Sequence, residues 1–159
     1  MHLHHTRVAL LASALSLATL SPTAMAQTLQ GGSSGGVAGP GVSASTYGSG
    51  QTSQTTDGST IGVTGGGEAT AIDGAASTRS DAKLNERRAM QRSVATARDE
   101  DERARSRTRT VVREGDEVCS RTVSIYKQKG ERPQREMTYS VSINEGATTE
   151  TKSNDRERR

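Results

Sequence analysis

Apolar residues follow four different patterns along the chain, and each pattern predicts a different kind of segment. A continuous apolar run covers residues 8–20, and residues 27–79 contain few large apolar side chains. Residues 80–107 lack Gly and Pro, whereas residues 108–152 alternate between apolar and polar positions. Helices and strands differ in hydrophobic period, so each change of pattern marks a change of structure.

The apolar run is the centre of a predicted secretory signal peptide, residues 1–26. It follows Arg7, is broken by Pro22 and is shorter than the roughly 20 apolar residues that span a bilayer. Ala24 and Ala26 supply the small residues of a cleavage site, which predicts a mature chain that begins at Gln27. We therefore expect a secreted or periplasmic protein, of bacterial type, with no membrane span after cleavage.

Residues 27–79 are dominated by Gly, Ser, Thr and Ala. Ordering so many glycines costs backbone entropy, and little apolar surface is available to offset that cost. This composition predicts a largely disordered, low-complexity arm. A hairpin or a small solenoid is the alternative, because two turn-forming pairs, Asp57-Gly58 and Asp73-Gly74, flank a stretch with β-branched residues.

Residues 80–107 are rich in helix formers, and we expect one charged helix there. Ser80 is a suitable N-cap, and Asp81 lies where a helix dipole favours an acid. Asp99 and Asp101 each precede an Arg by four residues, which is the favourable spacing for ion pairs on a helix.

Residues 108–152 show the period of two that is typical of strands. Met137, Tyr139, Val141 and Ile143 alternate with polar residues, and this spacing predicts one buried face. The expected fold class is therefore α+β, a small antiparallel β-meander preceded by one charged helix. The largely disordered Gly/Ser/Thr-rich arm precedes the helix, and residues 153–159 form a charged tail.

The composition limits the chemistry that this chain can perform. Hydrophobic residues make up 30% of the chain, and there is no Trp or Phe, so the expected core is too small for an enzyme cleft of ordinary size. The three His residues all lie within residues 1–26, and the chain has one Cys. A Ser-His or Cys-His catalytic pair and a zinc site are therefore not expected, and we predict no enzyme activity, no cofactor and no metal. A small hydrolase is the weaker alternative, because paired carboxylates cannot be recognised from spacing alone.

The strongest candidate for binding is a run of alternate arginines at residues 103, 105, 107 and 109. In a strand these side chains would share one face and form a cationic ridge, whereas in a helix they would spread around the axis. Expected partners are anionic polysaccharide or lipid headgroups, and export argues against intracellular nucleic acid. The competing interpretation is a solvated ridge that pairs with the nearby acids. A structural or adhesin-like module that acts through the Gly/Thr-rich arm is the alternative function. The four candidate residues are Arg103, Arg105, Arg107 and Arg109.

Cys119 is the single thiol, and it lies in a predicted strand on the same face as Val123 and Ile125. A small buried hydrophobe is one interpretation of this position. An intermolecular disulfide is the other, because an unpaired Cys in an oxidising compartment can bond to a partner.

We expect the exported protein to begin at Gln27. Intact-mass measurement of the protein recovered from outside the cytoplasm tests this expectation. A mass that retains Met1, or an N-terminus well inside the Gly-rich segment, would show that the cleavage site is wrong.

Overall fold

The computed structural model describes residues 27–55, 58–114, 117–143 and 146–148, and these residues form strands and short loops without a helix. The predicted signal peptide and the charged tail lie outside the described residues. The strands are β1 (Gln27–Ala38), β2 (Val42–Thr55), β3 (Gly58–Ala71), β4 (Ala75–Asn85), β5 (Arg88–Arg98), β6 (Glu102–Arg113), β7 (Glu117–Gln128), β8 (Gln134–Ile143) and β9 (Gly146–Thr148).

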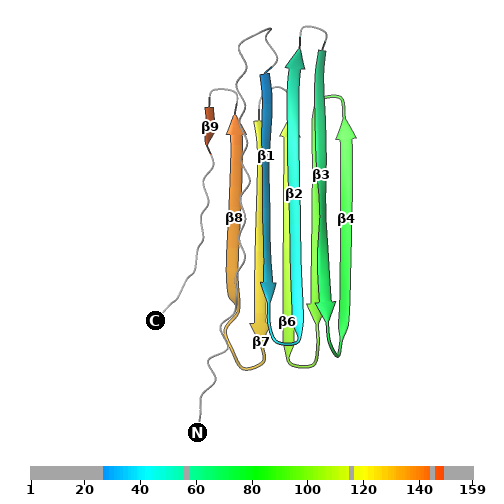
Figure 1. Ribbon diagram of the computed structural model, residues 1–159, viewed down its shortest axis with the longest axis vertical. Coiled ribbons are helices and arrows are strands. Elements are labelled where there is room, and N and C mark those ends of the chain that lie inside the picture. The colour runs from blue at the N-terminus through cyan, green and yellow to red at the C-terminus, as the bar shows by residue number, and fades with distance from the viewer. Residues whose placement is uncertain (1–26, 56–57, 115–116, 144–145, 149–159) are drawn as a thin grey trace.

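The strands form two antiparallel sheets that pack face to face (Figure 1). Strands β1, β2 and β3 form the first sheet in sequence order, and β4 to β9 form the second, also in sequence order. In the sandwich β1 lies over β7, β2 over β6 and β3 over β5. The six-stranded sheet therefore projects past the three-stranded sheet, with β4 on one side and β8 and β9 on the other (Figure 1).

The predicted α+β class is wrong, because the charged helix is absent. Residues 80–107 belong to β4, β5 and β6, which pair as an antiparallel meander. The residues that resemble helix formers alternate by size in β5, where Ala89, Ala95 and Ala97 are buried and Arg92 and Arg98 are exposed. Burial of these small side chains in the sandwich thus overrides the helix propensity of alanine, because propensity is weak compared with tertiary packing.

The prediction of a disordered arm is also wrong for the described part of residues 27–79. These residues form β1, β2, β3 and the start of β4. The hairpin alternative is the closer one, since β2 and β3 pair through Thr55 and Gly58, and Gly58 has a φ of 140° that suits glycine. Residues 56–57 of that turn lie outside the described residues. The segment is ordered because it packs on the second sheet. The composition of the segment alone does not indicate this packing.

The buried face of the C-terminal meander is the opposite of the predicted one. Strands β7 and β8 and the second half of β6 lie where the alternation predicts them, but Tyr139 and Ile143 are exposed. The side chains that face the first sheet are instead polar: in β8 they are Glu136, Thr138, Ser140 and Ser142, and in β7 they include Ser120, Thr122 and Ser124.

A continuous chain of hydroxyl groups fills the middle of the sandwich. Across β6 and β7 the directly opposed pairs Ser106–Ser124, Thr108–Thr122 and Thr110–Ser120 are hydrogen-bonded, with O···O distances of 2.9, 2.6 and 2.8 Å. Two hydroxyls from the first sheet join these three pairs. A hydroxyl both donates and accepts, so the buried groups satisfy one another.

The joining residues are Ser33 of β1 and Thr46 of β2. Ser33 lies 2.7 Å from Ser120 and 2.9 Å from Thr122, measured between hydroxyl oxygens. Thr46 lies 2.7 Å from Ser106 and 2.8 Å from Thr108. The hydroxyl chain therefore runs unbroken from Thr110 to Ser124 and connects the two sheets.

Small residues let the sheets approach closely enough for these bonds. Gly50 of β2 faces Val112, and a Cβ atom at Gly50 would collide with that side chain. Among the described residues, apolar burial is confined to two small clusters on either side of the hydroxyl chain. One cluster contains Val37, Val42, Ala44, Ala95, Ala97, Ala104 and Tyr126, and the other contains Ala89, Val112 and Val118.

A pair of neighbouring substitutions distinguishes the two possible buried faces of β8. Ser140 is 2% exposed and faces Gly31, whereas Val141 is half-buried on the outer surface. Ser140→Asp places an unpaired charge between the sheets, which costs several kcal/mol of the roughly 5–15 kcal/mol typical of a domain. We expect a thermal melt to show strong destabilisation for Ser140→Asp and little change for Val141→Asp. The reverse order would restore the buried face that the sequence predicts.

Candidate functional site

The four candidate arginines lie on one exposed face of β6. Residues 103, 105, 107 and 109 are exposed, and the residues between them are buried against the first sheet. Strand geometry places successive members of this row about 6.8 Å apart. The predicted geometry of the ridge is thus present, with Arg103, Arg105, Arg107 and Arg109 side by side on the outer surface.

Neighbouring strands widen the ridge into a two-dimensional array. Arg109 lies directly opposite Arg92 of β5 and Arg121 of β7. Arg103 likewise lies between Arg98 and Lys127. Like charges directly opposite one another destabilise a sheet. These opposed pairs therefore lower the stability of the fold.

The whole outer face of β4 to β8 is cationic. By register and exposure it carries thirteen basic side chains and only two acidic ones, Asp81 and Glu117. We call this surface the cationic face. Its basic residues are Arg79, Lys83, Arg88, Arg92, Arg98, Arg103, Arg105, Arg107, Arg109, Arg113, Arg121, Lys127 and Arg135.

Sequence reasoning missed most of this array. The arginines of β5 and β7 lie outside the alternating run and come beside the ridge through strand pairing. The period of two in residues 88–98 could have indicated strand β5. The pattern is hard to recognise because alanines and serines, rather than large apolar residues, occupy buried positions.

The acidic run at residues 99–102 does not neutralise the ridge. Asp99 accepts hydrogen bonds from the backbone N–H groups of Asp101 and Glu102 and so closes the β5–β6 turn. The Asp101 carboxylate pairs with Lys129 at 3.0 Å. The predicted helical ion pairs are therefore absent, and none of the four ridge arginines forms an ion pair with a described residue.

Glu102 is used inside the fold. It is 8% exposed, and its two carboxylate oxygens accept hydrogen bonds from the Tyr126 hydroxyl at 2.5 Å and from the Gly41 N–H at 2.8 Å. The pKa of Tyr126 is raised mainly by burial and to a smaller extent by the contact with Glu102. This acid ties the β1–β2 turn to β6 and β7 and is not available to the cationic face.

Half-buried apolar residues form the floor between the arginines. Val94 and Val123 lie directly opposite Arg107 on its two sides, and Ile125 lies opposite Arg105. Long arginine stems can cover such side chains while their guanidinium groups stay in water. The pKa of Arg107 is lowered mainly by partial burial and to a smaller extent by repulsion from Arg92 and Arg105.

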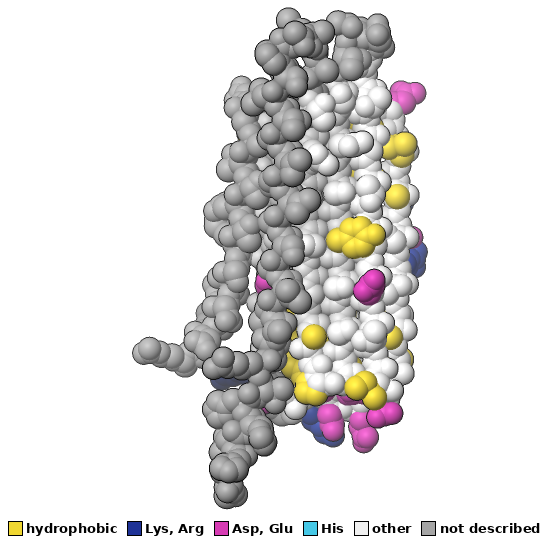
Figure 2. Space-filling view, in the orientation of Figure 1, with side chains coloured by type: hydrophobic (Ala, Val, Ile, Leu, Met, Phe, Trp, Pro, Cys, Tyr) yellow, Lys and Arg dark blue, Asp and Glu magenta, His cyan; other side chains and the backbone are white. Residues whose placement is uncertain are grey.

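The outer surface of the three-stranded sheet has a different character. Figure 2 shows a face made mostly of uncharged polar side chains and backbone, with isolated apolar and acidic groups. Glu68 is the one charged residue that the register places on the outside of β1 to β3 among the described residues, and Tyr47 is 53% exposed there. Charge is thus segregated between the two broad faces of the sandwich.

Cys119 lies on the cationic face, half-buried and with a free thiol. It is therefore not the core residue of the first interpretation. Its Sγ donates to Glu117 at 2.7 Å, and burial together with this carboxylate raises the pKa of the thiol to about 11. The intermolecular disulfide stays a prediction.

No cluster of three or more His, Cys, Asp or Glu side chains suited to a metal is present among the described residues. No described helix has the length and apolar character needed to cross a membrane.

In comparisons with known proteins, the chain matches no protein-family model, no curated protein and no solved structure.

We expect Cys119 to react slowly with iodoacetamide at neutral pH. A pKa of about 11 in place of 9.0 leaves about a hundredfold less thiolate, and the rate should rise with pH up to that value. Glu117→Gln removes a charge that opposes ionisation, so it should speed labelling. Fast labelling of the unchanged protein at pH 7, or a dimer on a gel that reductant abolishes, would contradict the protected thiol.

Proposed function

We propose that this protein is an exported, non-enzymatic protein that binds an anionic polymer through the cationic face. The observation that carries the proposal is the excess of basic over acidic residues on that face, thirteen against two. The chain as a whole has a net charge of only +3, so the charge is concentrated on one side. Such a field attracts and orients polyanions.

The residue type and spacing support a polymer rather than a single small anion. Eleven of the thirteen cations are arginines, whose guanidinium groups bind phosphate, sulfate or carboxylate in a bidentate manner. The array repeats at about 6.8 Å along a strand and about 4.8 Å between strands. A ligand with repeated charges can contact several arginines at once, which raises its apparent affinity over that of one charge.

Anionic polysaccharides and lipid headgroup surfaces both carry such repeated charges. The predicted signal peptide supports a site of action in the periplasm or outside the cell. An intracellular nucleic acid does not fit that location. The surface also offers few aromatic rings for base stacking, since the chain has three Tyr and no Phe or Trp.

Retention on heparin tests the proposal. We expect a variant with Arg105 and Arg107 changed to Gln to elute at clearly lower salt than the unchanged protein. Each contact between an arginine and the polyanion releases counterions. A variant that makes fewer contacts releases fewer counterions, so its affinity should also depend less steeply on salt concentration.

The matched control removes two cations outside the cationic face. Arg87 and Arg132 lie in the β4–β5 and β7–β8 loops, and their change to Gln alters the net charge by the same amount. We expect the loop variant to elute close to the unchanged protein. Equal shifts for the two variants would show that net charge alone controls retention, and would reject the face as a site.

A further inference from the structure

Strand β4 presents a long open edge. It pairs with β5 on one side and has no partner strand on the other among the described residues. All eleven of its residues are exposed, because the three-stranded sheet ends at β3 and does not cover it. An exposed edge of this length is a template for pairing with another strand.

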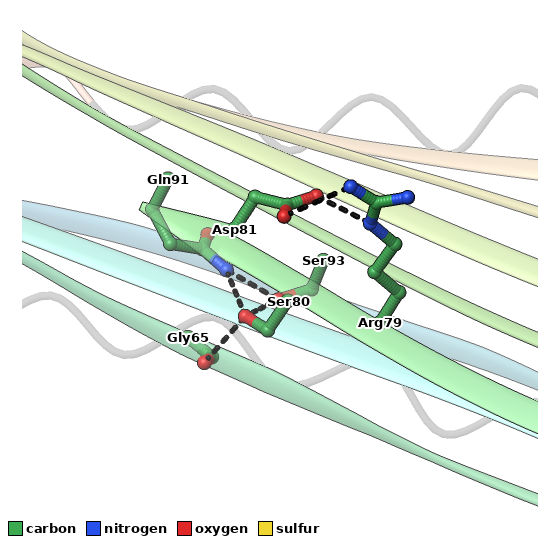
Figure 3. A network of polar contacts seen from close by, with 6 residues as sticks. All are labelled: Gly65, Arg79, Ser80, Asp81, Gln91 and Ser93. Carbon is green, nitrogen blue, oxygen red and sulfur yellow. Dashed lines mark hydrogen bonds and ion pairs between the residues drawn. The ribbon is translucent and has the colours of Figure 1, made fainter. Parts of the chain in front are cut away.

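Side-chain contacts hold this edge in place. Ser80, in the middle of β4, donates to the backbone carbonyl of Gly65 in β3 at 3.1 Å and lies 3.0 Å from the Ser93 hydroxyl (Figure 3). The Gln91 amide donates to Ser80 at 3.2 Å. Strand β4 is therefore attached to both sheets and is already extended before a partner arrives.

The polar groups of the free edge belong to the even-numbered residues. Asn85 and Arg88 pair across a loop of two residues, which leaves room only for a mutually hydrogen-bonded pair. Hydrogen-bonded pairs then recur at every second residue, so odd-numbered residues of β4 bond to β5. The N–H and C=O groups of residues 76, 78, 80, 82 and 84 point outward.

We propose that a second copy of this chain pairs with β4 through this edge, antiparallel and about a twofold axis at Ser80. The numbers of any two residues that lie opposite one another in the two β4 strands then sum to 160. Arg79 therefore lies opposite Asp81 of the other copy, and Asp81 lies opposite its Arg79. In one copy these two side chains already form an exposed ion pair at 2.8 Å on the same side of the strand (Figure 3). The edge is therefore complementary in charge to itself.

Other registers with the same hydrogen-bond phase are less favourable. A sum of 158 places Arg79 opposite Arg79, and a sum of 162 places Asp81 opposite Asp81, which is repulsive in both cases. A sum of 164 brings Asp81 to Lys83 but leaves the first four residues of β4 without partners. The sum of 160 pairs all eleven residues and contains no like-charged pair.

The same register covers exposed apolar surface. Leu84 is 69% exposed and, on the inner side of β4, lies opposite Ala76 of the second copy. The twofold arrangement makes the contact isologous and closed, so it gives a dimer rather than a fibre. It joins two six-stranded sheets into one and two cationic faces into one surface. The dimer does not depend on polyanion binding.

Sedimentation velocity over a range of concentrations, in the presence of reductant, tests the dimer. We expect Arg79→Asp and Asp81→Arg each to weaken dimerisation about tenfold or more, because each creates two like-charged pairs at the interface. The double variant restores the opposite-charge pairs and should regain the dimer. Arg135→Asp makes the same charge change on the same face away from β4 and should leave dimerisation unchanged.

Ala82→Pro gives an independent test of the hydrogen-bond phase. It removes an N–H that points to the free edge while leaving the bonds to β5, so the thermal melt should be nearly retained and the dimer lost. A protein that is monomeric at all concentrations would overturn the proposal. So would a dimer that the single charge variants leave unchanged, that the double variant does not rescue, that Arg135→Asp weakens equally, or that survives Ala82→Pro in a folded protein.

Discussion

The close contact between the two sheets is the constraint on which the rest of the structure depends. It requires small side chains on both inner faces, and the chain meets this need with Gly, Ala, Ser and Thr. The hydroxyls avoid the cost of burial by bonding to one another from Thr110 to Ser124, with Ser33 and Thr46 as the links between the sheets. Little hydrophobic surface is needed in the middle of the sandwich because these buried hydroxyl groups are paired.

Filling the interior with small residues leaves the long side chains on the outside. Val94 of β5 and Val123 and Ile125 of β7 therefore become the floor of the outer face, and the arginines extend over them. Glu102 and Asp99, which could have balanced this charge, are used to hold the turns at one end of the sandwich. The cationic face is thus a consequence of the same sorting by size that builds the core. The proposed binding role and the proposed β4 dimer both use surfaces that this sorting leaves open.

Sequence patterning located some elements correctly and misassigned others for definite reasons. Strands β7 and β8 and the end of β6 were predicted because alternation with a period of two is clear there, whereas the start of β6 was assigned to the helix. The rule that apolar residues face the core then selected the wrong side of β8, since Ser140 is buried and Tyr139 is exposed. Strands β1 to β3 were not predictable from local composition, because their order comes from packing on residues that are distant in sequence.

By itself, the sequence determined the alternation of the ridge arginines, the absence of His from residues 27–159 and the shortage of large apolar side chains. These features are local, and they limit the chemistry whatever the fold. Only the tertiary structure decided which face is buried, which strands lie beside the ridge and which edge stays open. Arg92, Arg109 and Arg121 come together because β5, β6 and β7 pair in one register. Register depends on contacts between strands and between sheets, and no single segment contains that information.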